Sequence, residues 1–176
     1  MSDSDLKPSS NIYLIGMPGS GKSVTGRLLA KHFGYSLIDL DDLIEKKSGR
    51  IIRDIFEESG ENTFRDLETD ALREISEKEN QVVATGGGII LRDLNWELME
   101  KTGKTVYLKT SPEWILKRTA HTDKRPLLNK PSREKAIQEL YEKREPLYEK
   151  ADYVCTTDDR SPKKVALEIE SKLNER

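Results

Sequence analysis

Cysteine and histidine are almost absent from this chain of 176 residues. Cys155 is the only cysteine, and His32 and His121 are the only histidines. One cysteine cannot form a disulfide within the chain or supply a thiolate zinc site. Two histidines are too few for a histidine-rich metal centre. The sequence therefore disfavours a protein built on disulfides or on a metal centre of cysteine and histidine ligands.

Long apolar runs and a large charge of one sign are also missing. No apolar stretch approaches the roughly 20 residues that cross a bilayer, and residues 1–10 are polar and too short for most targeting segments. Charged residues make up 35% of the chain, yet the net charge is only −2, which disfavours general nucleic-acid binding. We expect a cytoplasmic protein with a flexible N-terminus over residues 1–10 that binds neither membranes nor nucleic acid. We also expect a monomer.

Short apolar runs alternate with longer segments of helical periodicity. The predicted strands are Ile12–Ile15, Ser36–Leu40, Gln81–Ala84, Lys104–Leu108 and Asp152–Cys155. Alternation of this kind predicts an α/β fold with an open, mostly parallel sheet and helices on both faces. The length, together with the lack of repeats or linkers, predicts a single domain over residues 1–176.

Gly16–Ser23 reads Gly-Met-Pro-Gly-Ser-Gly-Lys-Ser and fits the G-x-x-x-x-G-K-[ST] pattern of a P-loop. A turn that binds nothing is the alternative. The loop, however, follows a predicted strand and precedes a predicted helix over residues 24–33, and these three parts form one anion-binding unit. In such a loop Lys22 reaches the β- and γ-phosphates, and the Ser23 hydroxyl ligates Mg²⁺. The pattern predicts a nucleotide site.

Carboxylates follow the predicted strand Ser36–Leu40, whereas the next two predicted strands end without an acid. Because parallel strands open their carboxyl ends onto the ligand crevice, we expect Asp39 and Asp41 near the phosphates. In extended backbone these two residues would point to the same side. One would serve the metal, and the other would meet an acceptor hydroxyl as base or orienter. The alternative role, capping the next helix, is expected of Asp42.

Two further stretches suggest close contact with a ligand. Gly86-Gly87-Gly88 ends a predicted strand, and three glycines are poor strand or helix formers, so we expect the backbone to approach a ligand there. A plain flexible turn is the alternative. Residues 119–131 lose helical periodicity and carry several basic residues. In a nucleotide-binding domain they are interpreted as a mobile lid, and otherwise as a solvated loop.

Two arginines stand at informative positions. Arg65 has Glu68 three residues further on, which is the spacing of a surface ion pair. Arg144 falls on the apolar stripe of its predicted helix, where a buried guanidinium needs a carboxylate or an anionic ligand as partner. Pro146 weakens that second inference, because the helix could distort or end near it. Several arginines at one pocket would suit an acceptor that carries a carboxylate.

These residues together resemble shikimate kinase, over nearly the whole chain from Asn11 onward. The matching pieces are Gly16–Ser23, Asp39-Leu40-Asp41, Phe64-Arg65 with Glu68, Gly86-Gly87-Gly88, Arg125-Pro126-Leu127-Leu128, and Arg144 before Pro146-Leu147-Tyr148. The resemblance implies a nucleoside monophosphate kinase-like fold, with three layers, a five-stranded parallel sheet, a lid, and a substrate-binding helical region over residues 41–78. It implies ATP-dependent, Mg²⁺-dependent phosphorylation of the 3-hydroxyl of shikimate, in the route to chorismate and aromatic amino acids.

The resemblance also implies roles for single residues. Asp41, Lys22 and Arg125 would be catalytic, and Ser23 and Asp39 would hold Mg²⁺. The nucleotide would contact Gly19, Ser20, Gly21, Lys22, Ser23, Val24, Arg118, Arg125 and Arg160. Shikimate would contact Asp41, Arg65, Gly86, Gly87, Gly88 and Arg144. Val24 departs from the pattern, since the family commonly has threonine there.

Three alternatives remain beside this interpretation. A gluconate-type or nucleoside monophosphate kinase would share the P-loop and the lid. A non-catalytic homologue would bind ligands without turnover, but it should have lost part of the catalytic set, and this chain has all of it. A GTPase would carry an N-K-x-D motif, and Asn129-Lys130-Pro131-Ser132 lacks the aspartate.

Overall fold

The computed structural model describes residues 10–120 and 132–175. Arg125 and nearly all of the predicted lid at 119–131 lie outside the described residues, as does most of the predicted flexible N-terminus. Within the described ranges, no helix is long and apolar enough to cross a membrane.

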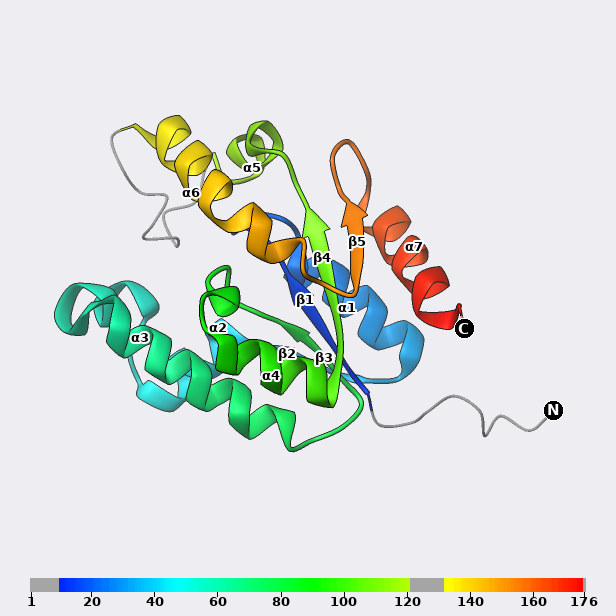
Figure 1. The fold of residues 1–176 in the computed structure, drawn as a ribbon, viewed down its shortest axis with the longest axis horizontal. Coiled ribbons are helices and arrows are strands. Elements are labelled where there is room, and N and C mark those ends of the chain that lie inside the picture. The colour runs from blue at the N-terminus through cyan, green and yellow to red at the C-terminus, as the bar shows by residue number, and fades with distance from the viewer. Residues whose placement is uncertain (1–9, 121–131, 176) are drawn as a thin grey trace.

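Five parallel strands form one sheet at the centre of the molecule (Figure 1). They are β1 (Asn11–Ile15), β2 (Ser36–Asp39), β3 (Gln81–Ala84), β4 (Gly103–Lys109) and β5 (Tyr153–Thr156). Their order is β2-β3-β1-β4-β5, with β1 paired to both β3 and β4. The predicted five-stranded parallel sheet is confirmed, and each strand overlaps its predicted range.

Helices cover both faces of the sheet. They are α1 (Lys22–Phe33), α2 (Leu40–Ser48), α3 (Ile52–Ser76), α4 (Asp93–Thr102), α5 (Pro112–Arg118), α6 (Arg133–Tyr148) and α7 (Pro162–Asn174), with a short 3₁₀ helix, η2 (Ile89–Leu91). Alternate side chains of the central strand take opposite faces, as the pleat requires. Tyr13 and Ile15 pack into the core beneath α2 to α6, whereas Ile12 and Leu14 pack beneath α1 and α7. The three-layer prediction is therefore confirmed.

The turn after β2 differs from its predicted form. The last pair in the ladder joins Asp39 to Ala84, and α2 begins at Leu40, so Asp41 already lies in the helix rather than in extended backbone. The cap of α2 is Asp39, whose Oδ1 accepts a hydrogen bond from the Asp42 N–H at 3.1 Å. The predictions of a shared extended face and of Asp42 as the cap are both wrong, because pairing with β3 ends at Asp39, one residue before the end of the predicted strand.

The helix that carries Arg65 and Glu68 is long and bent. α3 begins at Ile52, and Gly60 interrupts it with φ of 84°, a conformation that glycine adopts without a steric penalty. The half of α3 after this kink brings Arg65 and Glu68 beneath the glycine run that follows β3.

Candidate active site

A cavity of about 880 Å³ opens at the carboxyl ends of the strands. Its walls come from the P-loop after β1, the turn from β2 into α2, the start and middle of α3, the glycine run after β3, and single residues of α5 and α6. Crevices at this edge of an open parallel sheet are the usual ligand sites of α/β proteins. The fold therefore gathers sequence-distant polar residues around one space.

The loop Gly16–Ser23 and the start of α1 have the local features of an anion-binding site. Gly21 caps α1 in a left-handed conformation with φ of 91°, which favours glycine, and the first turn of α1 contains no acidic residue. The Lys22 ammonium donates to the carbonyl oxygens of Gly16 at 2.7 Å and Met17 at 3.0 Å, so it lies back over its own loop. The positive end of a helix and a neighbouring ammonium together favour a bound anion.

Ser23 and Asp39 meet at the start of α1 and the end of β2. The Ser23 hydroxyl donates to Asp39 Oδ2 at 2.8 Å, while the other carboxylate oxygen caps α2. Both residues line the cavity, and oxygen ligands of this kind suit Mg²⁺. Within residues 10–120 and 132–175 no group of three or more histidine, cysteine or acidic residues could hold a metal alone. That sparse donor set fits Mg²⁺, which usually keeps several waters and completes its shell with substrate phosphates.

The glycine run allows several side chains to approach the backbone closely. A Cβ placed on Gly86 would lie 2.6 Å from Glu68 Oε2 and 3.0 Å from Asp41 Oδ1. A Cβ on Gly88 would collide with the guanidinium group of Arg65. Any larger residue would displace these groups. Close packing, rather than the flexibility of a plain turn, accounts for the glycines.

The pair of Arg65 and Glu68 is buried. Arg65 Nη1 lies 3.0 Å from Glu68 Oε1, and the two side chains are 7% and 0% exposed. The ion pair that the spacing indicates is present, but the alternative of a surface pair does not hold, because the glycine run and two aromatic rings cover the two side chains. Burial raises the pKa of Glu68, although the neighbouring Arg65 charge acts in the opposite direction. The second oxygen of Glu68, Oε2, is buried and accepts no hydrogen bond from the residues described.

Arg144 is buried as well, with 4% of its surface exposed. α6 continues through Pro146 to Tyr148, so the proline does not displace it from the apolar face. One of its nitrogens, Nη1, lies 3.1 Å from the place that a Cβ of Gly87 would take. Among the residues that the structure describes, no carboxylate forms an ion pair with Arg144, although its guanidinium lines the cavity. A buried guanidinium that forms no ion pair with any of these residues favours an anionic ligand.

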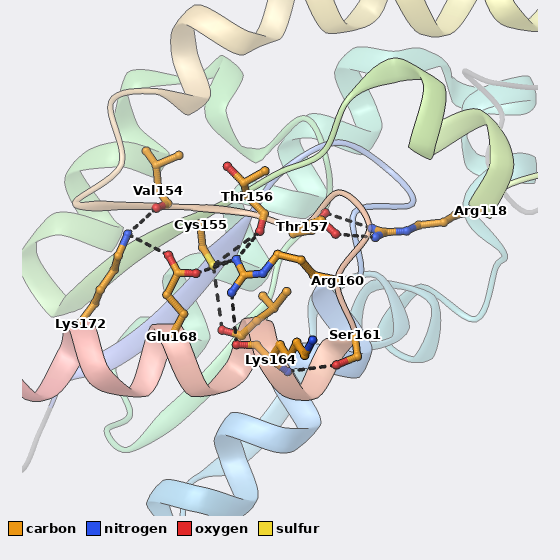
Figure 2. Close-up of polar contacts among 11 residues, drawn as sticks. Arg118, Val154, Cys155, Thr156, Thr157, Arg160, Ser161, Lys164, Glu168 and Lys172 are labelled. Atoms are coloured by element: carbon orange, nitrogen blue, oxygen red, sulfur yellow. Dashed lines mark hydrogen bonds and ion pairs between the residues drawn. The ribbon is translucent and has the colours of Figure 1, made fainter.

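The predicted nucleotide-binding residues separate into two groups. Val24, which is 46% exposed, and Arg118 line the cavity. Arg118 donates to the backbone and hydroxyl oxygens of Thr157 at 2.9 and 3.1 Å (Figure 2). Arg160 does not line the cavity. Its guanidinium donates to the Thr156 carbonyl at 2.7 Å and pairs with Glu168 of α7 at 2.6 Å (Figure 2). Its nucleotide-binding role stays a prediction.

Sequence reasoning missed the apolar wall of the cavity. Ile51, Ile52 and Phe56 line it from the start of α3, and the Phe56 ring packs on Phe64 with centroids 4.9 Å apart. Their helical spacing is that of any buried face, so the pattern carries no signal of a ligand wall. Together with the polar groups opposite, this wall fits a small molecule with an apolar ring and charged or hydroxylated edges.

Comparison with known proteins identifies the family. A family profile described as shikimate kinase matches residues 18–174. The chain belongs to the shikimate kinase family. It is 44% identical to the shikimate kinase of Thermodesulfovibrio yellowstonii, over 90% of this chain and 92% of that protein. It is 43% identical to the shikimate kinase of Persephonella marina, over 90% and 96% of the two chains.

A solved shikimate kinase is also similar in structure. The shikimate kinase from Acinetobacter baumannii, in complex with shikimate, matches with a TM-score of 0.91 and 38% identity, over 94% of this chain and 93% of that one. Five of the six pieces on which the resemblance to shikimate kinase rests contribute to the walls of this cavity. The sixth, Arg125-Pro126-Leu127-Leu128, lies outside the described residues.

Proposed function

We propose that this protein transfers the γ-phosphoryl group of ATP to the 3-hydroxyl of shikimate, which yields shikimate 3-phosphate and ADP. The observation that carries the proposal is Arg144, a buried guanidinium at the cavity wall that has no ion-pair partner among the described residues. Membership of the shikimate kinase family supplies the identity of the acceptor.

The acceptor would lie between the glycine run and α3. Its carboxylate would pair with Arg65 and Arg144, whose guanidinium groups lie against Gly88 and Gly87. Its ring would pack on the apolar wall at Phe56, and its hydroxyls would face Asp41 across the same cavity. Two guanidinium groups suit a carboxylate because each offers paired donors in a plane. On this account α2 and α3, over residues 41–78, form the acceptor side.

The donor would lie on the opposite wall, over the P-loop. The loop N–H groups and Lys22 would hold the β- and γ-phosphates, and Arg118 would contribute on the nucleotide side. Ser23 and Asp39 would hold Mg²⁺, which when bound neutralises charge on the phosphate oxygens. Val24 would contact the nucleotide by packing near the phosphates, because its side chain has no hydroxyl that could donate a hydrogen bond. Arg125 would add a further cation.

The reaction forms one bond and breaks one. The acceptor hydroxyl oxygen bonds to the γ-phosphorus, and the bond between that phosphorus and the β,γ-bridging oxygen breaks, so ADP leaves with the electron pair. Asp41 orients the hydroxyl and takes its proton, while Lys22 stabilises charge on the transferred group. Positioning and electrostatic stabilisation supply most of the acceleration in such transfers. All of these side chains come from one chain, which fits the proposal of a monomer.

A substrate panel tests the function. ADP release is measured with Mg²⁺ and ATP in the presence of shikimate, gluconate, a nucleoside monophosphate, or no acceptor. We expect release that depends on shikimate. Strong release with gluconate and none with shikimate would favour the gluconate-type alternative. Binding of shikimate and ATP without any turnover would favour a non-catalytic homologue. Light scattering on a size-exclusion column tests the monomer.

A further inference from the structure

Tyr148 connects the end of α6 to the glycine run of the cavity. Its side chain is fully buried, and its hydroxyl donates a hydrogen bond to the carbonyl oxygen of Gly87. Its ring stacks on Tyr107 of β4, with centroids 5.0 Å apart and planes inclined by 20°. Stacking holds the ring in place, so the hydroxyl has a defined direction.

The three carbonyl groups of the glycine run accept hydrogen bonds from different kinds of donor. The Gly86 carbonyl accepts from the Ile89 N–H and the Gly88 carbonyl from the Leu91 N–H, both at 3.1 Å. These two bonds belong to the local backbone turn. The Gly87 carbonyl depends on a side chain 61 residues away, that of Tyr148. None of the three glycine N–H groups donates to a residue that the structure describes, and all three glycines line the cavity.

The hydrogen bond to the Gly87 carbonyl also determines the direction of the Gly88 N–H. The carbonyl and the N–H of Gly88 belong to the same planar, trans peptide unit, so they point in opposite directions. Tyr148 holds the carbonyl from the buried side, which turns the Gly88 N–H away from the core. Between two glycines a peptide unit is otherwise free to rotate, because no Cβ limits either neighbour.

The end of α6, which carries Tyr148, also carries the Arg144 guanidinium. Arg144 precedes Tyr148 by four residues, which places both side chains on one face of α6. Arg144 lies beside Gly87 from one direction, and Tyr148 bonds to its carbonyl from another. The end of α6 therefore determines both a guanidinium and a backbone N–H at the same part of the cavity.

We propose that Tyr148 is a positioning residue for the acceptor: its hydroxyl sets the Gly87–Gly88 peptide so that the Gly88 N–H meets the acceptor carboxylate between Arg65 and Arg144. This inference rests on the proposed function. Tyr148 touches neither substrate. It acts through the peptide that it holds and, because its hydroxyl also interacts with the Arg144 guanidinium, through the placement of that side chain. Burial raises the pKa of Tyr148 to about 12, so the phenol remains a donor at neutral pH.

Tyr148→Phe removes the hydroxyl and keeps the stacked ring. We expect the KM for shikimate to rise about 5- to 10-fold, as befits one lost hydrogen bond, with the KM for ATP unchanged. Tyr107→Phe is the matched control. It removes the other buried hydroxyl of the stack, which makes no hydrogen bond to the glycine run, and we expect both KM values to stay near wild type.

Three results would overturn the inference. They are an unchanged KM for shikimate in Tyr148→Phe, an equal rise in Tyr107→Phe, and an equal rise in the KM for ATP. A general packing defect would give one of the last two. If the wild-type protein releases no ADP with shikimate, the proposed function itself fails. If the wild-type protein is active and Tyr148→Phe has the same KM for shikimate, only the inference about Tyr148 fails.

A second variant covers the case in which Tyr148→Phe does not fold. 3,5-Difluorotyrosine at position 148 keeps both ring and hydroxyl but has a more acidic phenol. At neutral pH we expect its KM for shikimate to match that of wild type. At alkaline pH we expect the KM of the variant to rise, because its phenol loses the proton, whereas the KM of wild type stays constant. Parallel pH profiles for the two proteins would contradict the assigned role.

Discussion

The Ser23 hydroxyl donates a 2.8 Å hydrogen bond to the carboxylate of Asp39, and this contact joins the first turn of α1 to the end of β2. Asp39 has two tasks, since its other oxygen caps α2. A substitution can separate them, because asparagine caps helices about as well as aspartate but carries no charge.

Asp39→Asn tests the metal role of this contact. We expect stability near wild type and a rise of about 10- to 100-fold in the Mg²⁺ concentration that gives half-maximal activity. Titration of activity with Mg²⁺, alongside thermal unfolding, measures both quantities. Asp70→Asn, at an exposed position of α3 that does not line the cavity, is the control and should leave the Mg²⁺ requirement unchanged. An unaltered requirement in Asp39→Asn would remove Asp39 from the metal site.

Asp41 is assigned to the acceptor side of the cavity. Asp41→Asn removes the carboxylate that orients the hydroxyl and takes its proton, so we expect kcat to fall by roughly 10² to 10⁴. ATP affinity should remain near normal, because the nucleotide lies on the opposite wall. Steady-state kinetics and calorimetric titration with ATP measure the two effects. A comparable loss of ATP affinity would show that Asp41 belongs to the nucleotide side.

Arg144→Met tests whether the buried guanidinium serves a ligand rather than the fold. Among the described residues none forms an ion pair with Arg144, and the nearby Glu68 carboxylate is already paired with Arg65, so we expect a free energy of unfolding close to that of wild type. The KM for shikimate should rise about 10- to 100-fold through the loss of charged hydrogen bonds. Arg73→Met, at an exposed arginine of α3, should change neither quantity. A large loss of stability in Arg144→Met would assign the guanidinium to the fold.

Glu68 should make stability depend on pH. Burial raises its pKa above the ordinary value of 4.5, so the folded state binds this proton more tightly than the unfolded state. The resulting stabilisation is fully present below the ordinary pKa and is lost as the pH rises through the folded value. Glutamine does not titrate. The free energy of unfolding of wild type minus that of Glu68→Gln should therefore decrease as the pH rises above 4.5, by at most about 1.4 kcal/mol per pH unit.

Urea unfolding at a series of pH values measures this difference. Glu57→Gln, at an exposed position of the same helix, is the control, and its stability should follow wild type in parallel. A difference for Glu68→Gln that grows with pH would mean that Arg65 dominates and that the carboxyl is held ionised.

The sequence predicts most of the fold because its signals are local. Alternating apolar runs place the strands, and the apolar stripe of α6 is enough to predict that Arg144 lies in the interior. Where prediction failed, long-range pairing decides the outcome. Asp39 caps α2 because its ladder with β3 ends there, and nothing in the run Asp39 to Asp42 reports that register.

Burial and distant contacts account for the other differences. A spacing of three residues fits an exposed ion pair as well as a buried one, so the pattern of Arg65 and Glu68 cannot reveal that the glycine run covers both. The hydrogen bond from Tyr148 to Gly87 joins segments 61 residues apart, and no local periodicity encodes it. Those contacts are the ones that shape the acceptor side of the cavity.

Phosphorus and proton NMR of the reaction mixture test the central claim most directly. The protein is incubated with Mg²⁺, ATP and shikimate, and the products are identified without a coupling enzyme. We predict equal amounts of ADP and of one new phosphate ester, with its phosphorus coupled to the proton on carbon 3 of shikimate. Unchanged ATP, or ADP accompanied only by inorganic phosphate, would contradict the account.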